Sequence, residues 1–338
     1  MSTLARFPRI RLTQGPTPLE PLSRLTQLLG GPNLYIKRDD NTGLALGGNK
    51  TRKLEFLLGD AVAKGATHIV TQGATQSNHV RQTIAAANRL GLKTTILLEE
   101  RISDGHADYY NNGNVLLDQL LGASIETRPG GLDMNQELIA VGERLQAEGE
   151  VPYLIPGGGS NAIGALGYVV SAQELLQQST DQGLVIDQVI HATGSTGTQA
   201  GLVTGLQAAN SNIPVLGISV RAPREKQIDN VTRLALQTWD LLNIRQPFNP
   251  ASVAVNADYV GHGYGVPTEA SLEAIHLLAR YEGILLDPVY SSKAFAGLID
   301  LIRQGHFRKG QNVVFIHTGG AVGLFGYREL LEPDGGVR

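Results

Sequence analysis

The sequence contains no cysteine among its 338 residues. Without cysteine the chain forms no disulfide, uses no thiolate nucleophile and builds no cysteine-ligated zinc site. This absence agrees with a cytoplasmic protein, which is the location we expect. Any covalent chemistry must therefore depend on another type of side chain.

The sequence also lacks an excess of one charge and any long apolar run. Its 28 basic and 31 acidic residues give a net charge of -3, so we expect neither nucleic acid nor a membrane surface as the main partner. No apolar run reaches the roughly 18 residues that a membrane helix requires, and residues 1–14 lack the apolar core of an export signal. The eight histidines do not form an HExxH pattern, so we expect no metal site.

Short apolar runs alternate with helical patterns along most of the chain. One helical pattern places Phe295, Leu298, Ile299 and Ile302 at positions i, i+3, i+4 and i+7. The length exceeds that of a usual single domain, so the sequence predicts an α/β protein of two domains with open, mostly parallel twisted sheets flanked by helices. The runs expected to form strands are residues 67–73, 92–100, 123–129, 151–158, 186–194, 213–223 and 312–320.

Lys50 lies in the glycine-rich segment GGNKTRK, directly before a helical pattern. Burial and the positive end of a helix both favour the neutral amine, so this lysine is a candidate for forming a Schiff base. The segment is not a P-loop, because Asn49 stands between Gly48 and Lys50 where that motif requires adjacent residues. The alternative is a surface lysine beside a flexible turn.

Ser77, Asn78 and His79 follow a predicted strand and stand at the entrance of a predicted helix. Unpaired backbone N–H groups and short polar side chains at such a position can hold a carboxylate. The alternative is ordinary capping of the helix by Ser77 or Asn78.

A second loop of this kind contains Gly194, Ser195, Thr196, Gly197 and Thr198. Its glycines allow a tight turn, and its hydroxyl groups and helix N-terminus suit a phosphate. The pattern is not the dinucleotide motif GxGxxG, and an ordinary turn from strand to helix is the alternative.

Near the C-terminus, Tyr264, Tyr290 and Thr318 stand at the ends of predicted segments. The tyrosine hydroxyls can reach a cleft, although a buried tyrosine with one hydrogen bond is the more usual case. A threonine hydroxyl at the end of a strand can meet a ring nitrogen. A lysine, a phosphate loop, an asparagine and this threonine together fit a pyridoxal 5'-phosphate (PLP) site.

Several motifs, in order over nearly the whole chain, resemble one known family. They include TPLEPLSRL, GLALGGNKTRKLEF, GATQSNHVRQT, GSTGTQAG, GYGVP, LLDPVYSSK and FIHTGGA. The chain is similar to the D-cysteine desulfhydrase and 1-aminocyclopropane-1-carboxylate deaminase family, which has the tryptophan-synthase β-like fold of type II PLP enzymes. The resemblance implies a large domain of residues 1–52 plus 162–338, a small domain of residues 53–161, an active site between them, and a homodimer.

The resemblance also implies which residues hold the cofactor. Lys50 matches the lysine that forms the Schiff base, and Asn78 matches the asparagine beside the 3'-oxygen of the ring. Lys53 and the loop from Thr193 to Thr198 match the phosphate contacts. Thr318 stays the candidate partner of the ring nitrogen from its place at the end of a strand. A neutral hydroxyl there would leave this nitrogen unprotonated and limit how far negative charge spreads into the ring.

The same resemblance assigns a substrate side to the site. Ser77, Asn78 and His79 match the loop around the substrate carboxylate, and Ser77 also matches a position that assists proton transfer. Tyr264 and Tyr290 match two tyrosines that line the pocket, Tyr290 being in contact with the cofactor as well. The implied reaction is a β-elimination from a small amino acid that yields pyruvate and ammonia.

The group that leaves from the substrate depends on departures from the family pattern. The cyclopropane deaminases carry glutamate where this chain has Ser291, so ring opening is disfavoured. Two carbon–sulfur lyase activities remain, and Arg221 at the end of a predicted strand favours release of sulfite from L-cysteate, because its paired N–H groups suit a sulfonate. Release of sulfide from D-cysteine is the alternative. Two other readings of Arg221 stay open: the side chain is exposed to solvent, or it pairs with Glu225. A PLP-binding homologue that has lost turnover is a further alternative for the whole protein.

Overall fold

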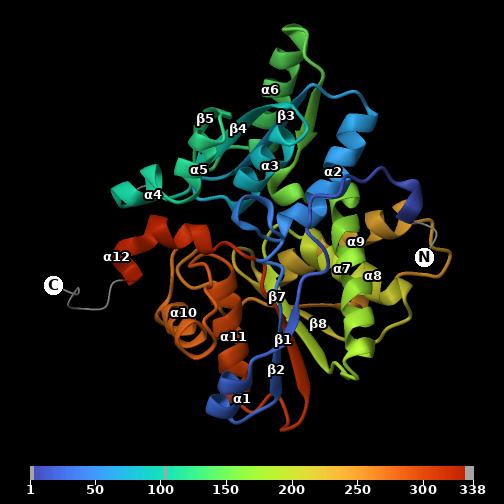
Figure 1. The fold of residues 1–338 in the computed structure, drawn as a ribbon, viewed down its shortest axis with the longest axis vertical. Helices are drawn as coiled ribbons and strands as arrows, with labels where there is room; N and C mark the ends of the chain where they lie inside the picture. Colours follow the sequence, from blue (N-terminus) through green and yellow to red (C-terminus); the bar gives the residue numbers. More distant parts are fainter. Residues whose placement is uncertain (1–3, 103–104, 332–338) are drawn as a thin grey trace.

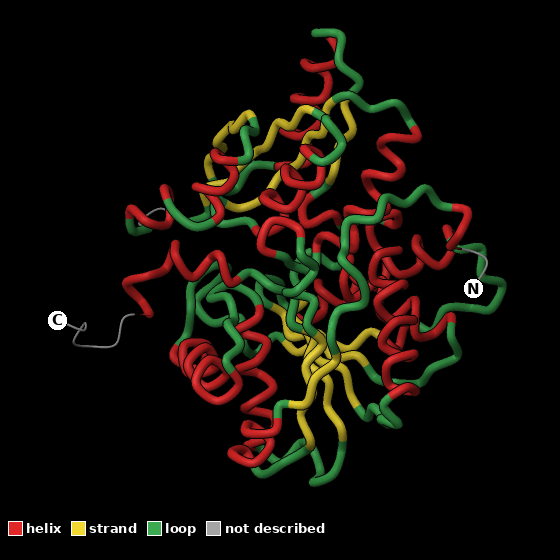
Figure 2. Tube along the Cα trace, viewed as in Figure 1, coloured by secondary structure: helices red, strands yellow, loops and turns green. Residues whose placement is uncertain are grey.

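The chain forms two separate sheets, seen in a computed structural model that describes residues 4–102 and 105–331 (Figure 1). The larger sheet has the strand order β1-β2-β10-β7-β8-β9, and the smaller has the order β5-β4-β3-β6. Neighbouring strands run parallel except for β1 against β2. Figure 2 shows both sheets surrounded by helices, which confirms the predicted fold class.

All seven runs predicted as strands contain one. The smaller sheet consists of β3 (His68–Ala74), β4 (Lys93–Glu100), β5 (Ser124–Pro129) and β6 (Pro152–Ile155). The larger sheet consists of β1 (Leu19–Pro21), β2 (Asn33–Lys37), β7 (Gln188–Thr193), β8 (Val215–Ser219), β9 (Val253–Asn256) and β10 (Asn312–Ile316). The prediction missed β1, β2 and β9. The strands β1 and β9 have only three and four residues, and β2 contains the charged Lys37.

Helices cover both faces of each sheet. On one face of the larger sheet lie α7 (Ala162–Asp181), α8 (Gly197–Ala208) and α9 (Arg224–Leu241), and on the other lie α1 (Ser23–Leu29), α10 (Glu269–Glu282) and α11 (Ser291–Arg303). The smaller sheet packs against α2 (Lys50–Ala63), α3 (Asn78–Asn88) and α6 (Met134–Ala147), and α5 (Asn114–Leu120) packs against α3. Two short helices, α4 (Ala107–Asn111) and α12 (Arg328–Leu331), complete the described set of α-helices.

The larger sheet takes its strands from both sides of the smaller one in the sequence. Its first two strands end at residue 37 and its other strands begin at residue 188, whereas the smaller sheet spans residues 68–155. The helix α2 continues through the predicted boundary at residue 52, and α7 begins at the predicted boundary at residue 162. The two domains with those boundaries stay a prediction.

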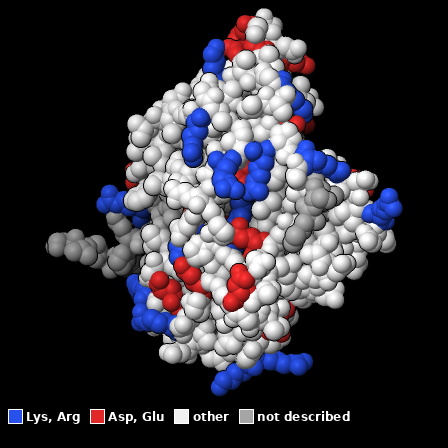
Figure 3. All heavy atoms as spheres, turned by 45° about the vertical axis from the view of Figure 1, so that its right-hand side comes forward, with Lys and Arg blue, Asp and Glu red and all other residues white. Residues whose placement is uncertain are grey.

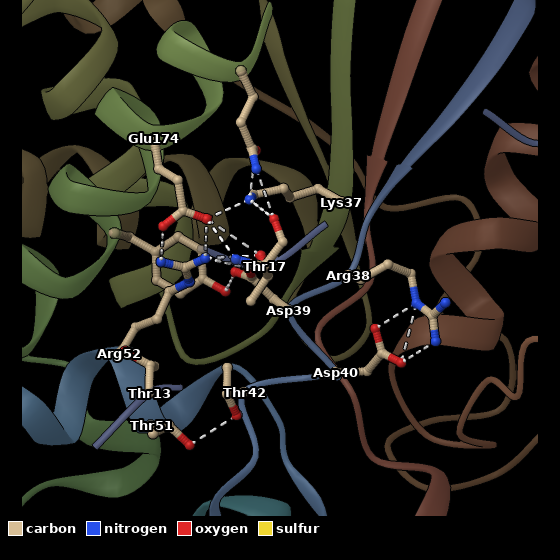
Figure 4. Close-up of polar contacts among 12 residues, drawn as sticks. Thr13, Thr17, Lys37, Arg38, Asp39, Asp40, Thr42, Thr51, Arg52 and Glu174 are labelled. Carbon is tan, nitrogen blue, oxygen red and sulfur yellow. Dashed lines mark hydrogen bonds and ion pairs between the residues drawn. The ribbon is translucent and has the colours of Figure 1, made fainter. Parts of the chain in front are cut away.

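A buried polar cluster anchors α2 to the larger sheet (Figure 4). Arg52, two residues after Lys50, donates to the carboxylates of Asp39 and Glu174 at 2.8 Å each. Glu174 also accepts from Lys37. Because these contacts join α2 to β2 and α7, they fix the direction in which the first turn of α2 points.

The surface carries charges of both signs. Figure 3 shows basic and acidic side chains interspersed over one face, with large uncharged areas between them. In the part of the chain that the structure describes, no helix is long and apolar enough to cross a membrane.

Candidate active site

A cavity of about 480 Å³ lies where loops from both sheets meet. The loop after β3 forms one wall, and the loops after β7, β8 and β10 form others. Lys53 and Gly197 are the two predicted site residues that do not line it. The predicted site residues that do line it are Lys50, Ser77, Asn78, His79, Thr193, Gly194, Ser195, Thr196, Thr198, Arg221, Tyr264, Tyr290 and Thr318.

Lys50 is the first residue of α2, and its side chain opens to the cavity. Its Nζ lies 3.3 Å from Oγ of Ser195. Burial lowers the pKa of Lys50 to about 8, an effect that a hydrogen bond with Lys53 partly offsets. A sizeable fraction of this amine is therefore neutral and nucleophilic near neutral pH, unlike that of a surface lysine.

A close backbone contact holds the Lys50 loop against the end of β10. The amide of Asn49 donates to the carbonyl oxygen of Thr318 at 3.0 Å. A Cβ atom on Gly319 would lie 2.8 Å from Cα of Gly48, and the φ of Gly319 is +86°. Only glycine fits at this position, so the glycines bring Thr318 and the lysine to the same cavity.

The loop after β7 has the form of an anion cradle. It leads into the N-terminus of α8, and Thr196 holds a positive φ of 67° that costs a threonine about 1–3 kcal/mol. Across from it, a Cβ on Gly158 would lie 2.4 Å from Oγ of Ser195 and 3.3 Å from Nζ of Lys50. The glycine therefore allows the turn after β6 to pack closely against Ser195 and Lys50.

Lys53 and Gly197 lie directly behind this cradle. Lys53 Nζ donates to the carbonyl oxygen of Gly158 at 3.1 Å and to Oγ of Ser160 at 3.3 Å. Burial, together with the charge of Lys50, holds the pKa of Lys53 well below its usual value. Among the described residues neither lysine has a carboxylate partner, so a phosphate group beside them would supply the missing negative charge. The residues present therefore fit PLP.

The loop after β3 lines the cavity opposite the cradle. Ser77 is the N-cap of α3, and its Oγ accepts from the amide of Val80 at 3.3 Å, so the capping alternative is correct and holds together with its place in the cavity. His79 Nε2 lies 2.9 Å from Oγ1 of Thr71. Burial first, and then the charges of Lys50 and Lys53, hold the pKa of His79 well below its usual value, so its ring is neutral.

Two tyrosines close the cavity on the third side. The hydroxyl groups of Tyr264 and Tyr290 hydrogen-bond to each other. Burial raises the pKa of Tyr264, although the charge of Arg101 opposes the shift, and burial raises the pKa of Tyr290 well above its usual value. Both phenols are therefore protonated at neutral pH and face the cavity as hydrogen-bonding groups.

Two arginines stand beside the tyrosines. Cζ of Arg101 lies 4.6 Å from the ring centroid of Tyr264, and its guanidinium pairs with Glu99 at 2.6 Å. Arg221 is exposed and lines the cavity from the end of β8. Its predicted alternative partner, Glu225, pairs with Arg224 instead.

The sequence reasoning missed several lining residues. Arg101 lies in the smaller sheet's loops and meets Tyr264 of the other half, a contact between distant segments that no local pattern reveals. Gly158 and Ser160 follow β6 in the segment PGGGSN, and this glycine-rich turn after a strand is the same signal that identified the loop after β7. That signal was present and was not used for the site.

Comparison with known proteins agrees with this arrangement. Residues 10–319 match the family described as pyridoxal-phosphate dependent enzyme. A protein named D-cysteine desulfhydrase from Yersinia enterocolitica is 48% identical over 324 residues, which cover 96% of this chain and 97% of the relative. A protein of the same name from Klebsiella pneumoniae is 46% identical over 331 residues, covering 98% and 99%.

Solved structures show the same relationship. A structure described as an ACC deaminase homologue has a TM-score of 0.88 and 39% sequence identity, with 98% of this chain and 97% of that chain covered. A structure described as a T.th. threonine deaminase has a TM-score of 0.62 at 22% identity, with 90% and 92% covered, and it supports the fold alone. The resemblance expected from the motifs is confirmed, and the chain belongs to the family of pyridoxal-phosphate dependent enzymes.

Proposed function

We propose that the protein is a PLP-dependent carbon–sulfur lyase that eliminates sulfide from D-cysteine and, with the uptake of one water molecule, leaves pyruvate and ammonia. The observation that carries the proposal is the meeting of Lys50, the anion cradle and the tyrosine pair in one cavity. The names of the relatives support D-cysteine better than L-cysteate, which the sequence alone had favoured. The favoured substrate is therefore revised.

Several residues would hold the cofactor. Lys50 would bind it covalently through Nζ, and the backbone at the start of α8 would bind its phosphate together with Lys53. Thr318 would meet the ring nitrogen, and Asn78 the ring oxygen. When bound, PLP withdraws electrons from Cα of the amino acid and so allows loss of the Cα proton and of the group on Cβ.

The protein side of the reaction then follows from the geometry. The substrate carboxylate would lie at the N-terminus of α3, near Ser77 and His79, where backbone N–H groups favour an anion. Once the substrate's amine had taken its place, the freed amine of Lys50, whose pKa of about 8 leaves part of it neutral, would accept the Cα proton. Tyr264 and Tyr290 would donate a proton to the departing sulfur, since both phenols are protonated at neutral pH.

One observation favours a second candidate, L-cysteate. Arg101 and Arg221 both line the cavity beside Tyr264, and two guanidinium groups suit a sulfonate more than a thiol. Arg101 is already paired with Glu99, so Arg221 is the group with free donors to offer within the described cavity wall. Release of sulfite stays the alternative reaction.

The test is to measure pyruvate release from D-cysteine, L-cysteine, L-cysteate and 1-aminocyclopropane-1-carboxylate with the PLP-loaded protein. We expect the highest kcat/KM for D-cysteine, with sulfide as the second product. Faster sulfite release from L-cysteate would select the second candidate instead. Turnover of none of the four would refute the proposed lyase. The homodimer and the cytoplasmic location stay predictions.

The substitution Arg221→Gln separates the two substrates. If a sulfonate binds here, the loss of one charge-assisted contact raises the KM for L-cysteate about tenfold or more and leaves the kcat/KM for D-cysteine nearly unchanged. Arg224→Gln is the matched control, because Arg224 is a neighbouring exposed arginine that does not line the cavity. An unchanged KM for L-cysteate in the Arg221 variant would remove the argument for the second candidate.

A further inference from the structure

A fully buried guanidinium joins three segments behind the active site. Arg81 lies in α3 and is 0% exposed. One of its nitrogens, Nη2, donates to the carbonyl oxygen of Gly47 at 2.7 Å and to Oδ1 of Asn78, and the other, Nη1, donates to Oδ1 of Asn114 at 2.6 Å. Gly47 belongs to the Lys50 loop, and Asn114 is the first residue of α5.

The charge of this group is maintained in spite of its burial. Burial lowers the pKa of Arg81 to about 10, and the side chain of Asp118 opposes this shift, although burial raises the pKa of Asp118 itself well above its usual value. Asp118 lies one turn into α5, and among the described residues neither of its oxygens has a hydrogen-bond partner. Arg81 is therefore charged at neutral pH. Its guanidinium contacts the Lys50 loop at Gly47 and also contacts Asn78.

The bond to Asn78 decides which end of that amide faces the cavity. Its oxygen is occupied by Arg81, so its nitrogen is the group left to interact elsewhere. Nδ2 lies near Gly48, where an added Cβ would come within 2.6 Å of it. An amide held this way offers a donor to the cavity, and a donor suits the negatively charged oxygen of a bound ring.

We infer that Arg81 is a positioning residue that locks Asn78 as a hydrogen-bond donor to the 3'-oxygen of the PLP ring. The inference rests on the proposed PLP site but requires no turnover. Without Arg81 the amide can rotate and present its oxygen, which repels an anion. The ring oxygen then becomes harder to ionise.

The test is an absorbance titration of PLP-loaded Arg81→Met and Arg81→Lys against pH. We expect the absorbance ratio of the visible band to the near-ultraviolet band to fall about three- to tenfold at neutral pH, because one hydrogen bond to the ring oxygen is lost. We also expect the pH at the midpoint of the titration to rise. Arg81→Lys keeps the charge and cannot make the same paired contacts, so it serves where Arg81→Met does not fold.

Two comparisons show whether Arg81 acts through Asn78. Adding Arg81→Met to Asn78→Ala should cause no further spectral change, because the amide that Arg81 orients is already gone. Asp118→Asn should keep the wild-type band ratio, because it replaces the acid beside Arg81 without removing a bond to Gly47 or Asn78. An Arg81→Lys protein with the wild-type band ratio and midpoint would overturn the inference, as would a further shift in the double variant.

The test of Arg81 and the test of the proposed function can fail independently of each other. A wild-type protein that gains no visible band when PLP is added would refute both the cofactor site and the role of Arg81. A wild-type protein with the band and without pyruvate release would refute the lyase alone, and the titration would still decide the role of Arg81.

Discussion

Replacing Lys50 with alanine is expected to abolish the visible absorbance band of the PLP-loaded protein and to reduce pyruvate release by at least about 10²–10⁴-fold, the contribution of a general base. Among the described residues that line the cavity, Lys50 is the one lysine, and its pKa of about 8 keeps part of it neutral. Alanine removes both the covalent attachment of the cofactor and the proton acceptor. Absorbance spectra and a pyruvate assay measure the two losses separately.

A matched control lies on the same helix. Lys64 follows the last turn of α2, is largely exposed and pairs with Asp60, so Lys64→Ala should keep the band and the activity. Survival of the visible band in Lys50→Ala would show that another amine binds the cofactor. Lys53 would then be the first candidate, because it is the next lysine along the helix and lies behind the same cradle.

Replacing Arg52 with methionine is expected to lower the free energy of unfolding by about 3–5 kcal/mol, the usual cost of removing one partner from a buried ion pair. The side chain is 4% exposed and contacts Asp39, which is 0% exposed, as well as Glu174 (Figure 4). Methionine would leave both carboxylates without their guanidinium. Urea-induced unfolding measures the loss, and Arg303→Met, which breaks an exposed pair with Glu273, should cost less than about 1 kcal/mol.

The same cluster gives the stability a pH dependence with a definite sign. Burial alone would raise the pKa of Asp39 and of Glu174, but the contacts with Arg52 and Lys37 together outweigh it, and both pKa values are lowered. A group with a lowered pKa contributes stability above its ordinary value of about 4, and this contribution disappears as the pH falls through the folded-state value. The difference in unfolding free energy between the wild type and Arg52→Met should therefore shrink on acidification below pH 4. A constant difference would contradict the assigned role.

The fold was predictable because buried parallel strands leave a strong local signal. The runs at residues 67–73 and 312–320 have β-branched or apolar residues at their centres, end in glycine and overlap β3 and β10. The strand β2 carries Lys37 in a fully buried position, where its charge is matched by Glu174 far along the chain. A pattern of apolar residues cannot anticipate such pairing, and β2 was missed for that reason.

The residues of the candidate site also divide into those that the sequence reveals and those that it does not. Lys50, Ser77 and the loop around Thr196 were identifiable because each stands between a strand or glycine turn and a helix. Arg101 and Arg81 act through contacts with residues that are distant in sequence or hidden in the interior, Tyr264 for the first and Gly47 for the second. Their importance follows from packing, which only the three-dimensional arrangement supplies.

The position of β10 has a consequence for the order in which the protein can assemble. This strand pairs with both β2 and β7, so the centre of the larger sheet is formed by the last strand in the described chain. On the ribosome, the N-terminal strands emerge long before the partner that joins them to the rest of the sheet. The contact between Thr318 and Asn49 also forms only at that stage, so a nascent chain has no complete active site until residue 318 has been synthesised.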